Sequence, residues 1–329
     1  SREGHGPEVP DGLHALKSPD GIRWTPMSDG PVIADGDLDS QNLAFWDSVR
    51  GEYRDYHRNE RGRGKTGNDF YGRDMRTATS SDFIHWSEPE YINYAQGRTD
   101  ELYNSAIIPY FRAPHIFVGF PNRYIDRGWT DAIEDLPELE ERRRRANVVE
   151  RYGSALSDGM FMSSRDGHHW DRTFMESFVR PGTSPRGWTS RNNLLSSGIV
   201  ETGENELSMY ILRHRDFPSV HFERVTIRKD GFVSAAAGFA GGELVTRPMV
   251  FKGGELELNY STSAAGAMKV EMQDETGKPI PGYALDDYPE MFGDEIAGTA
   301  RWSRGSGLEA LSGKTVRLRF WLKDADLFA

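Results

Sequence analysis

The sequence has 329 residues, of which 37% are hydrophobic and 12% aromatic, which is enough for one large domain and a smaller partner domain. Its formal net charge of -11 argues against a nucleic-acid partner, because nucleic acid requires a basic face. The chain has no Cys, which excludes disulfides and thiolate metal sites. Since no apolar run could cross a bilayer and residues 1–30 lack a signal-peptide pattern, we expect no membrane partner and an export signal that is absent or removed.

The first predicted element is a turn that recurs along the chain. It reads "SPDGIRW" from Ser18, "SSDFIHW" from Ser80 and "SRDGHHW" from Ser164, with a weaker copy, "RKDGFVS", from Arg228. Asp and Gly suit a turn between strands, and Trp suits the edge of a core. The spacings of 62, 84 and 64 residues indicate one repeat unit, with 22 extra residues between the second and third copies. The Glu- and Arg-rich segment at about 131–152 accounts for them and predicts an inserted surface helix.

The first repeat is shorter than the later ones. In the second repeat the first predicted strand begins 38 residues before the turn, but only 17 residues precede Ser18. We therefore expect that an N-terminal portion is missing from this chain or is supplied by a separate fragment or chain.

Each later repeat contains four segments with the apolar or alternating pattern of strands. They read "NLAFWD", "EYRDYHR", "RDMRTAT" and "EPEYINY" in the second, "NSAIIPY", "HIFVGF", "GMFMSS" and "RTFMESFV" in the third, and "SSGIVET", "ELSMYILR", "HFERVTI" and "GFVSAAA" in the fourth. Four antiparallel strands at this period are typical of a β-propeller blade, and tandem sandwiches are the alternative.

The pattern changes near residue 240. Segments such as "GELELNYSTS" and "TVRLRFWLKD" alternate with a period of two and are joined by Gly-rich turns, which predicts a β-sandwich. The predicted fold is therefore all-β, with a β-propeller over residues 1–239, whose first blade is incomplete, and a β-sandwich over residues 240–329.

Two carboxylates occupy equivalent places before the innermost strands of neighbouring repeats. Asp39 and Glu101 are 62 residues apart, so we expect both at one mouth of the propeller channel. Paired carboxylates can divide acid and base roles, as glycoside hydrolysis requires. The alternative is that both cap strands or pair with arginines. Asp74 and Asp158, each six residues before a repeated turn, are further candidates, although a structural role in each blade is the alternative.

Basic and aromatic residues are expected around the same mouth, where they could contact a sugar. Arginine can bind carboxylate or sulfate groups, and aromatic rings can stack on sugar faces; charge balance and core packing are the alternatives. The candidates are His57, Arg58, Arg73, Tyr103, Arg123, Trp188, Arg191, Asn192 and His214. We find no metal-ligand spacing and expect no metal and no cofactor.

These features resemble the five-bladed propeller glycoside hydrolases of the invertase and arabinanase type, especially family 32. The resemblance rests on the repeated turns, an Asp before "NLAFWD", a Glu before "LYNSAIIPY" and the appended sandwich, and it spans nearly the whole chain. It implies three catalytic carboxylates, one from each of the first three blades. Asp39 matches the second but lacks the family's neighbouring Arg and Pro, and Glu101 matches the acid/base Glu but lacks the Cys-Pro of invertases. The first carboxylate has no counterpart in this chain.

The resemblance therefore implies a secreted or periplasmic hydrolase of oligo- or polysaccharides, and the expected basic residues would suit an anionic substrate with uronic or sulfated sugars. Glu101 would be the general acid, and Asp39 would orient the substrate or tune that acid. The alternatives are a carbohydrate-binding propeller without catalysis, a sialidase-like hydrolase, and a lyase acting on uronates.

Overall fold

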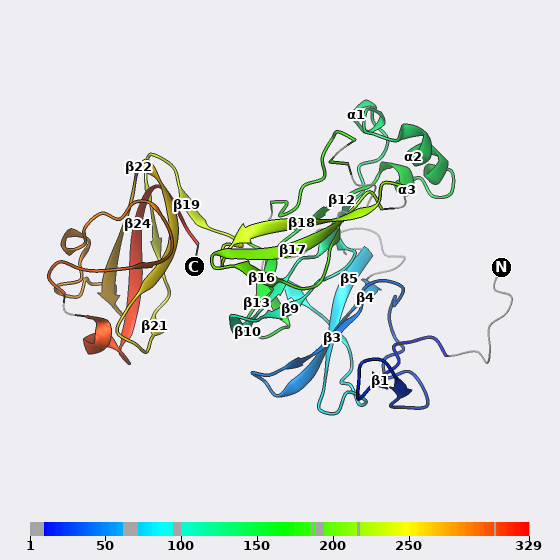
Figure 1. Cartoon of the computed structure of the whole chain (residues 1–329), viewed down its shortest axis with the longest axis horizontal. Helices are drawn as coiled ribbons and strands as arrows, with labels where there is room; N and C mark the ends of the chain where they lie inside the picture. Colours follow the sequence, from blue (N-terminus) through cyan, green and yellow to red (C-terminus); the bar gives the residue numbers. More distant parts are fainter. Residues whose placement is uncertain are drawn as a thin grey trace. The chain divides into compact units, whose positions relative to one another are not determined.

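The computed structural model describes residues 10–61, 72–94, 100–174, 176–185, 187–188, 194–215, 218–305 and 307–328 (Figure 1). Of the described residues, 45% lie in strands and 8% in helices, which confirms the all-β prediction. The chain divides into two compact units. Unit 1 comprises residues 1–199 and 209–225, and unit 2 comprises residues 200–208 and 226–329. Among the described residues, no helix is long and apolar enough to cross a membrane.

The second repeat forms the predicted four-stranded antiparallel sheet. Its strands lie in sequence order and are β3 (Leu43–Asp47), β4 (Glu52–Arg61), β5 (Gly72–Ser80) and β6 (Glu90–Tyr91). Tyr56 and Met75 are fully buried and belong to one core cluster, together with Phe117 of the next repeat. The apolar and alternating patterns were therefore sufficient to locate this sheet.

The third repeat forms two sheets instead of one. The larger has the order β7 (Asn93–Tyr94), β14 (His169–Asp171), β13 (Met162–Ser164), β10 (Ala113–Gly119) and β9 (Ile108–Tyr110). The smaller contains β12 (Leu156–Gly159), β11 (Asn122–Ile125) and β8 (Glu101–Leu102). The fourth strand, expected at residues 172–179, is β14 instead, because the buried Trp170 takes the place opposite Ser164 in the sheet. β7 from the second repeat pairs with β14 in parallel.

Three short helices occupy the predicted insertion. They are α1 (Asp131–Glu134), α2 (Leu139–Ala146) and α3 (Arg151–Ser154). Thr130 caps α1, since its hydroxyl accepts a hydrogen bond from the Ile133 N–H at 3.3 Å. Arg142 is only 4% exposed, and its guanidinium donates to the carbonyls of Pro137 and Leu136. One arginine of the "ERRRR" run thus stabilises the loop before α2.

The fourth repeat also forms a four-stranded sheet, but its strands are not the four predicted ones. β17 (Glu206–Arg213) begins in unit 2, where β16 (Val200–Gly203) pairs with it, and ends in unit 1, where β15 (Leu194–Leu195) pairs with it. β18 (His221–Arg228) follows it in the chain. The predicted last strand, residues 231–237, contains β19 (Ala235–Ala237), which pairs with β24 of unit 2. The described residues show no closed propeller.

Unit 2 contains one six-stranded sheet, where a sandwich of two sheets was expected. Its long strands are β22 (Glu257–Asp274) and β24 (Thr315–Leu327), joined by β19, β20 (Gly242–Val245), β21 (Met249–Val250) and β23 (Asp294–Thr299). β19, β20 and β21 share one edge of β24, and β22 shifts register between Thr262 and Ala267, so the strands stay connected in one sheet. The 3-10 helices η1 (Leu285–Asp287) and η2 (Leu308–Leu311) complete the unit, and its core contains Trp302, Tyr283 and Phe320.

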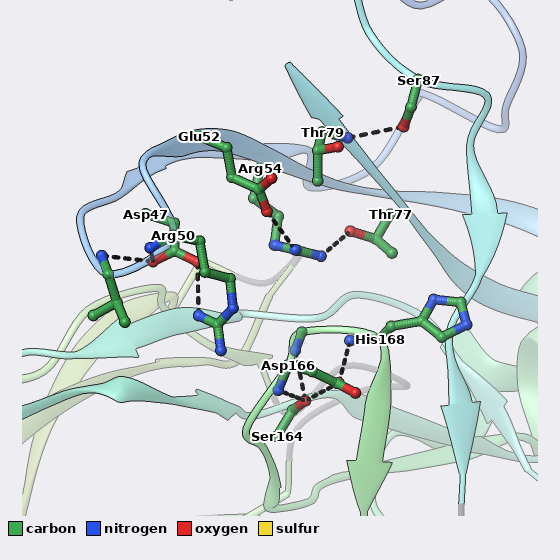
Figure 2. Close-up of polar contacts among 12 residues, drawn as sticks. Asp47, Arg50, Glu52, Arg54, Thr77, Thr79, Ser87, Ser164, Asp166 and His168 are labelled. Atoms are coloured by element: carbon green, nitrogen blue, oxygen red, sulfur yellow. Dashed lines mark hydrogen bonds and ion pairs between the residues drawn. The ribbon is translucent and has the colours of Figure 1, made fainter. Parts of the chain in front are cut away.

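The repeated turn forms the same hydrogen bonds in all three strong copies, which explains its sequence. In the third copy the Ser164 hydroxyl accepts from the Gly167 N–H at 2.8 Å. The Asp166 carboxylate accepts from the N–H groups of His168 and His169, and Figure 2 shows the bond from His168. The Trp170 indole N–H donates back to the Gly167 carbonyl. The copies at residues 18 and 80 repeat each bond. Gly167 has φ of 80°, and Phe83, at the equivalent place, adopts 68°.

The first repeat contributes a two-stranded sheet of β1 (Leu16–Lys17) and β2 (Thr25–Pro26) on either side of the first turn.

Candidate functional site

Glu101 lies between two arginines in unit 1. One carboxylate oxygen accepts from the Arg73 guanidinium at 2.8 Å and the other from the Arg151 guanidinium at 2.6 Å. The Glu101 side chain is 14% exposed. Gly72 makes this position possible, because a Cβ there would come within 2.3 Å of the Glu101 Cγ. The strand start at Gly72 is therefore built around the Glu101 side chain.

Tyr124 organises the same group of charges. It lies opposite Glu101 in the pairing of β11 with β8, and the Arg73 and Arg151 guanidinium carbons lie 5.3 and 4.5 Å from its ring centre. Its hydroxyl donates to the Arg151 carbonyl at 3.3 Å. Burial opposes the Arg151 charge, but the hydrogen bond and charge of Glu101 outweigh burial and raise the pKa of Arg151. Both arginines are thus held in a fixed, charged arrangement.

Asp39 lies beside this group, in the loop before β3. The Arg58 guanidinium donates to its carboxylate, which is 81% exposed. Arg58 itself is 4% exposed and lies over the ring of Tyr103 at 4.9 Å, and Arg73 lies over the same ring at 5.3 Å. Tyr103 therefore connects the arginine of Asp39 with one of the arginines of Glu101. The two carboxylates predicted to share a mouth belong to one connected group of side chains.

A cavity of about 560 Å³ opens beside Asp39. Its polar lining combines carboxylates and arginines, namely Asp11, Asp37, Asp39, Glu60, Arg58 and Arg73. Glu101 is not part of this lining and lies behind Arg73. Asp39 is therefore the predicted catalytic residue that borders open space, whereas Glu101 contacts the cavity through an arginine.

The two further candidate aspartates lie inside the fold. Asp74 is fully buried, and its carboxylate accepts from the Met75 N–H at 2.7 Å. Asp158 is 3% exposed and binds Arg123 through two bonds, of 3.0 and 2.6 Å. The hydrogen bond that Arg123 donates to Asp158 outweighs burial and raises the pKa of Arg123. These contacts are those of the structural alternative, and a catalytic role for either aspartate stays a prediction.

His57 is also fully buried, although it was predicted to contact substrate. Its Nδ1 is hydrogen-bonded to the carboxylate of Asp55. Burial raises the pKa of Asp55, while the hydrogen bond and charge of His57 oppose this. His57 lies against Gly36, since a Cβ at that glycine would be 2.9 Å from the imidazole Cδ2. His57 therefore packs against Gly36, which lines the cavity.

The remaining predicted sugar contacts lie elsewhere. Trp188 is 3% exposed; its indole donates to Glu138 at 3.1 Å, and Arg142 of the insertion lies over its ring. His214 is half-buried and contacts Ser219. Arg191 and Asn192 lie outside the described residues.

Sequence reasoning missed Arg151, Glu60 and the role of Gly72. Arg151 belongs to the insertion, which was predicted to be a surface helix, and nothing in its local pattern separates it from the neighbouring arginines. Glu60 continues the second-strand segment by two residues, so its place at the cavity follows from strand length. A signal for Gly72 exists only once its neighbour in space is known. No group of three or more acidic or His side chains suited to a metal occurs in the part of the chain that the structure describes.

No protein-family model and no curated protein matches the chain. Among solved structures, it is similar to a glycoside hydrolase at 12% identity and a TM-score of 0.37, over 62% of this chain and 52% of that one. It is also similar to an N-acetylgalactosamine deacetylase from F. plautii in complex with blood group B trisaccharide, at 12% identity and a TM-score of 0.37, over 96% and 61%. A third is a mutant GH32 β-fructofuranosidase from Bombyx mori in complex with sucrose, at 10% identity and a TM-score of 0.32, over 96% and 84%.

The chain thus spans about half the length of the first of these structures. Glycoside hydrolases are among the structures to which the chain is similar, but TM-scores this low carry no argument about function. The site residues alone support the proposal below.

Proposed function

We propose that this protein hydrolyses a glycosidic bond at the cavity beside Asp39. The observation that carries the proposal is an open cavity of about 560 Å³ that is lined by several carboxylates and by two arginines already paired with carboxylates. Sugars present many hydroxyl groups, which such a lining can bind. Hydrolysis of a glycosidic bond needs a pair of carboxyl groups, one on each side of the bond.

Within this proposal Asp39 is the first reacting carboxylate, because its side chain is 81% exposed and borders the cavity. The second carboxylate comes from the same lining, from Glu60 or Asp37. Glu101 can donate a proton only after Arg151 or Arg73 leaves one of its oxygens, since both are occupied. Its proposed role is therefore to position Arg73, and the sequence-based role of general acid is the alternative.

The substrate is proposed to be a neutral sugar. Arg58 and Arg73, which were expected to bind acidic groups on a sugar, are each paired with a carboxylate of the protein. A uronic or sulfated sugar would have to displace these partners at a cost. An anionic substrate is the alternative that the screen below separates.

Sugar binding without catalysis is the second candidate function. Both oxygens of Glu101 accept hydrogen bonds from arginines, so neither is available to transfer a proton. This arrangement favours sugar binding without catalysis.

The test is a screen of neutral, uronic and sulfated oligosaccharides and 4-nitrophenyl glycosides, measured as sugar or nitrophenol release. Asp39→Asn should lower kcat by at least about 100-fold, because a positioned acid or base contributes this much. Glu60→Gln, Asp37→Asn and Glu101→Gln then identify the second carboxylate. Asp286→Asn, an exposed change in unit 2, is the control. Unchanged turnover in Asp39→Asn would refute the proposed site, and sugar binding without release by wild type would favour the second function.

A further inference from the structure

A second cavity shares Asp39 with the first. It has a volume of about 330 Å³. The apolar part of its lining is Tyr103, Leu194, Leu195, Leu212 and Phe222, and the polar part is Asp39, Ser40, Gln41, Asn104, Ser196 and Arg215. Every residue of this lining belongs to unit 1. Asp39 belongs to both cavities, so the exposed carboxylate lies where the two meet.

The apolar part of this lining comes from strands that pair or follow each other. Leu194 of β15 lies opposite Leu212 of β17, and Leu195, which is 2% exposed, follows Leu194 in the same strand. Phe222 of β18 is 66% exposed. The exposed Phe222 ring, with the half-buried Leu194 and Leu212, offers apolar area that a ligand can cover, which is favourable in proportion to that area.

The wall between the cavities is well supported. The Ser40 hydroxyl donates to the Tyr103 carbonyl at 3.3 Å, and the Gln41 side chain accepts from the Ala106 N–H at 2.8 Å. Arg58 holds the Asp39 carboxylate and lies over the Tyr103 ring. The carboxylate therefore belongs both to a polar cavity and to one whose lining is about half apolar.

We propose that the second cavity binds the leaving group of the substrate and that this group is hydrophobic, such as an aryl aglycone. This inference rests on the proposed hydrolysis. The polar cavity would hold the sugar, and Asp39 would lie beside the bond between the two parts. In the reaction the glycosidic C–O bond breaks, and water supplies a hydroxyl to the anomeric carbon and a proton to the leaving oxygen. A cavity of about 150 Å³ binds benzene, so 330 Å³ has room for a substituted ring.

The experiment compares 4-nitrophenyl, phenyl and methyl glycosides of the same neutral sugars, with wild type, Phe222→Ser and Phe292→Ser. Phe292 is 68% exposed in unit 2, which makes it a matched control. We expect Phe222→Ser to raise KM for the aryl glycosides about five-fold, because the aryl ring of the glycoside loses roughly 40 Å² of apolar contact with Phe222. KM for the methyl glycoside and the kinetics of Phe292→Ser should not change. Thermal unfolding of each variant checks that the fold is kept.

Binding of phenyl glycosides, observed by saturation-transfer NMR, separates this inference from the hydrolysis proposal. If aryl and methyl glycosides are cleaved and Phe222→Ser affects both equally or neither, the apolar cavity is not the leaving-group site, while hydrolysis stands. If nothing is cleaved but phenyl glycosides bind and Phe222→Ser weakens their binding, the apolar site stands and hydrolysis fails. If wild type neither cleaves nor binds phenyl glycosides, the inference is overturned.

Discussion

Replacing Arg151 by Met should loosen the helical insertion, because Arg151 is its charged contact with Glu101. The two side chains are 26% and 14% exposed, and their ion pair has a length of 2.6 Å. An exposed ion pair contributes under about 1 kcal/mol, and breaking a buried one costs about 3–5 kcal/mol, so the energy of this half-buried pair should lie between these values. Loss of the contact with the Tyr124 ring adds about 0.5 kcal/mol. We therefore expect Arg151→Met to lower the free energy of opening α3 by about 2 kcal/mol.

Hydrogen–deuterium exchange of α3 measures this cost locally. The Ala155 N–H donates to the Arg151 carbonyl at 3.0 Å, so its exchange reports opening of α3. A change of 2 kcal/mol corresponds to exchange about 30-fold faster in Arg151→Met. The control is Arg144→Met, which removes an exposed arginine paired with Glu141 in α2 and should change exchange less than about three-fold. Equal exchange in the two variants would refute a specific role for the Arg151 contact.

Three further predictions test the packing of the site and of the turns. Gly72→Ala should displace Glu101 and lower the thermal midpoint, since the new Cβ would meet Glu101 and φ there is 138°; Gly51→Ala, with φ of 69° and open space, should cost only about 1 kcal/mol. Burial would raise the pKa of Asp166, but hydrogen bonds from the N–H groups and ring of the following histidines outweigh burial and lower it. The stabilisation from the Asp166 carboxylate is therefore present above about pH 4 and is lost below. Asp166→Asn should flatten the fall of the thermal midpoint between about pH 4 and pH 2. Trp170→Ala should cost about 3–5 kcal/mol in urea unfolding and Trp24→Ala under about 1 kcal/mol, because these rings are 1% and 57% exposed.

Local pattern was enough to predict the second repeat. The side chains of β3 alternate in burial, β4 and β5 lie over the two segments predicted to follow it, and the Ser-x-Asp turn marks where β5 ends. The same reasoning failed where a strand's partner lies far away in the sequence. β19 looks like the end of a fourth blade, but its partner is β24, about 90 residues later, and no local pattern identifies a partner.

The charges of the site show the same limit. A 62-residue spacing was sufficient to propose that Asp39 and Glu101 lie near each other. The sequence favoured catalytic roles for Asp39 and Glu101, and pairing of these carboxylates with arginines was the alternative. The contact of Glu101 with Arg151 depends on how the insertion folds back onto β8. Burial of His57 likewise depends on the loop at Gly36, which no strand pattern describes.

The repeat explains why the functional group of residues lies between repeats and not within one. Arg73 belongs to the second repeat and Glu101 to the third, and Tyr103 contacts both Arg73 and the Arg58 that holds Asp39. A similar contact occurs at the turns, where the Tyr56 hydroxyl of the second repeat donates to the Gly167 carbonyl of the third at 2.6 Å. These contacts join the second repeat to the third, so a change at one of these residues should be felt first at the boundary between the sheets of these two repeats.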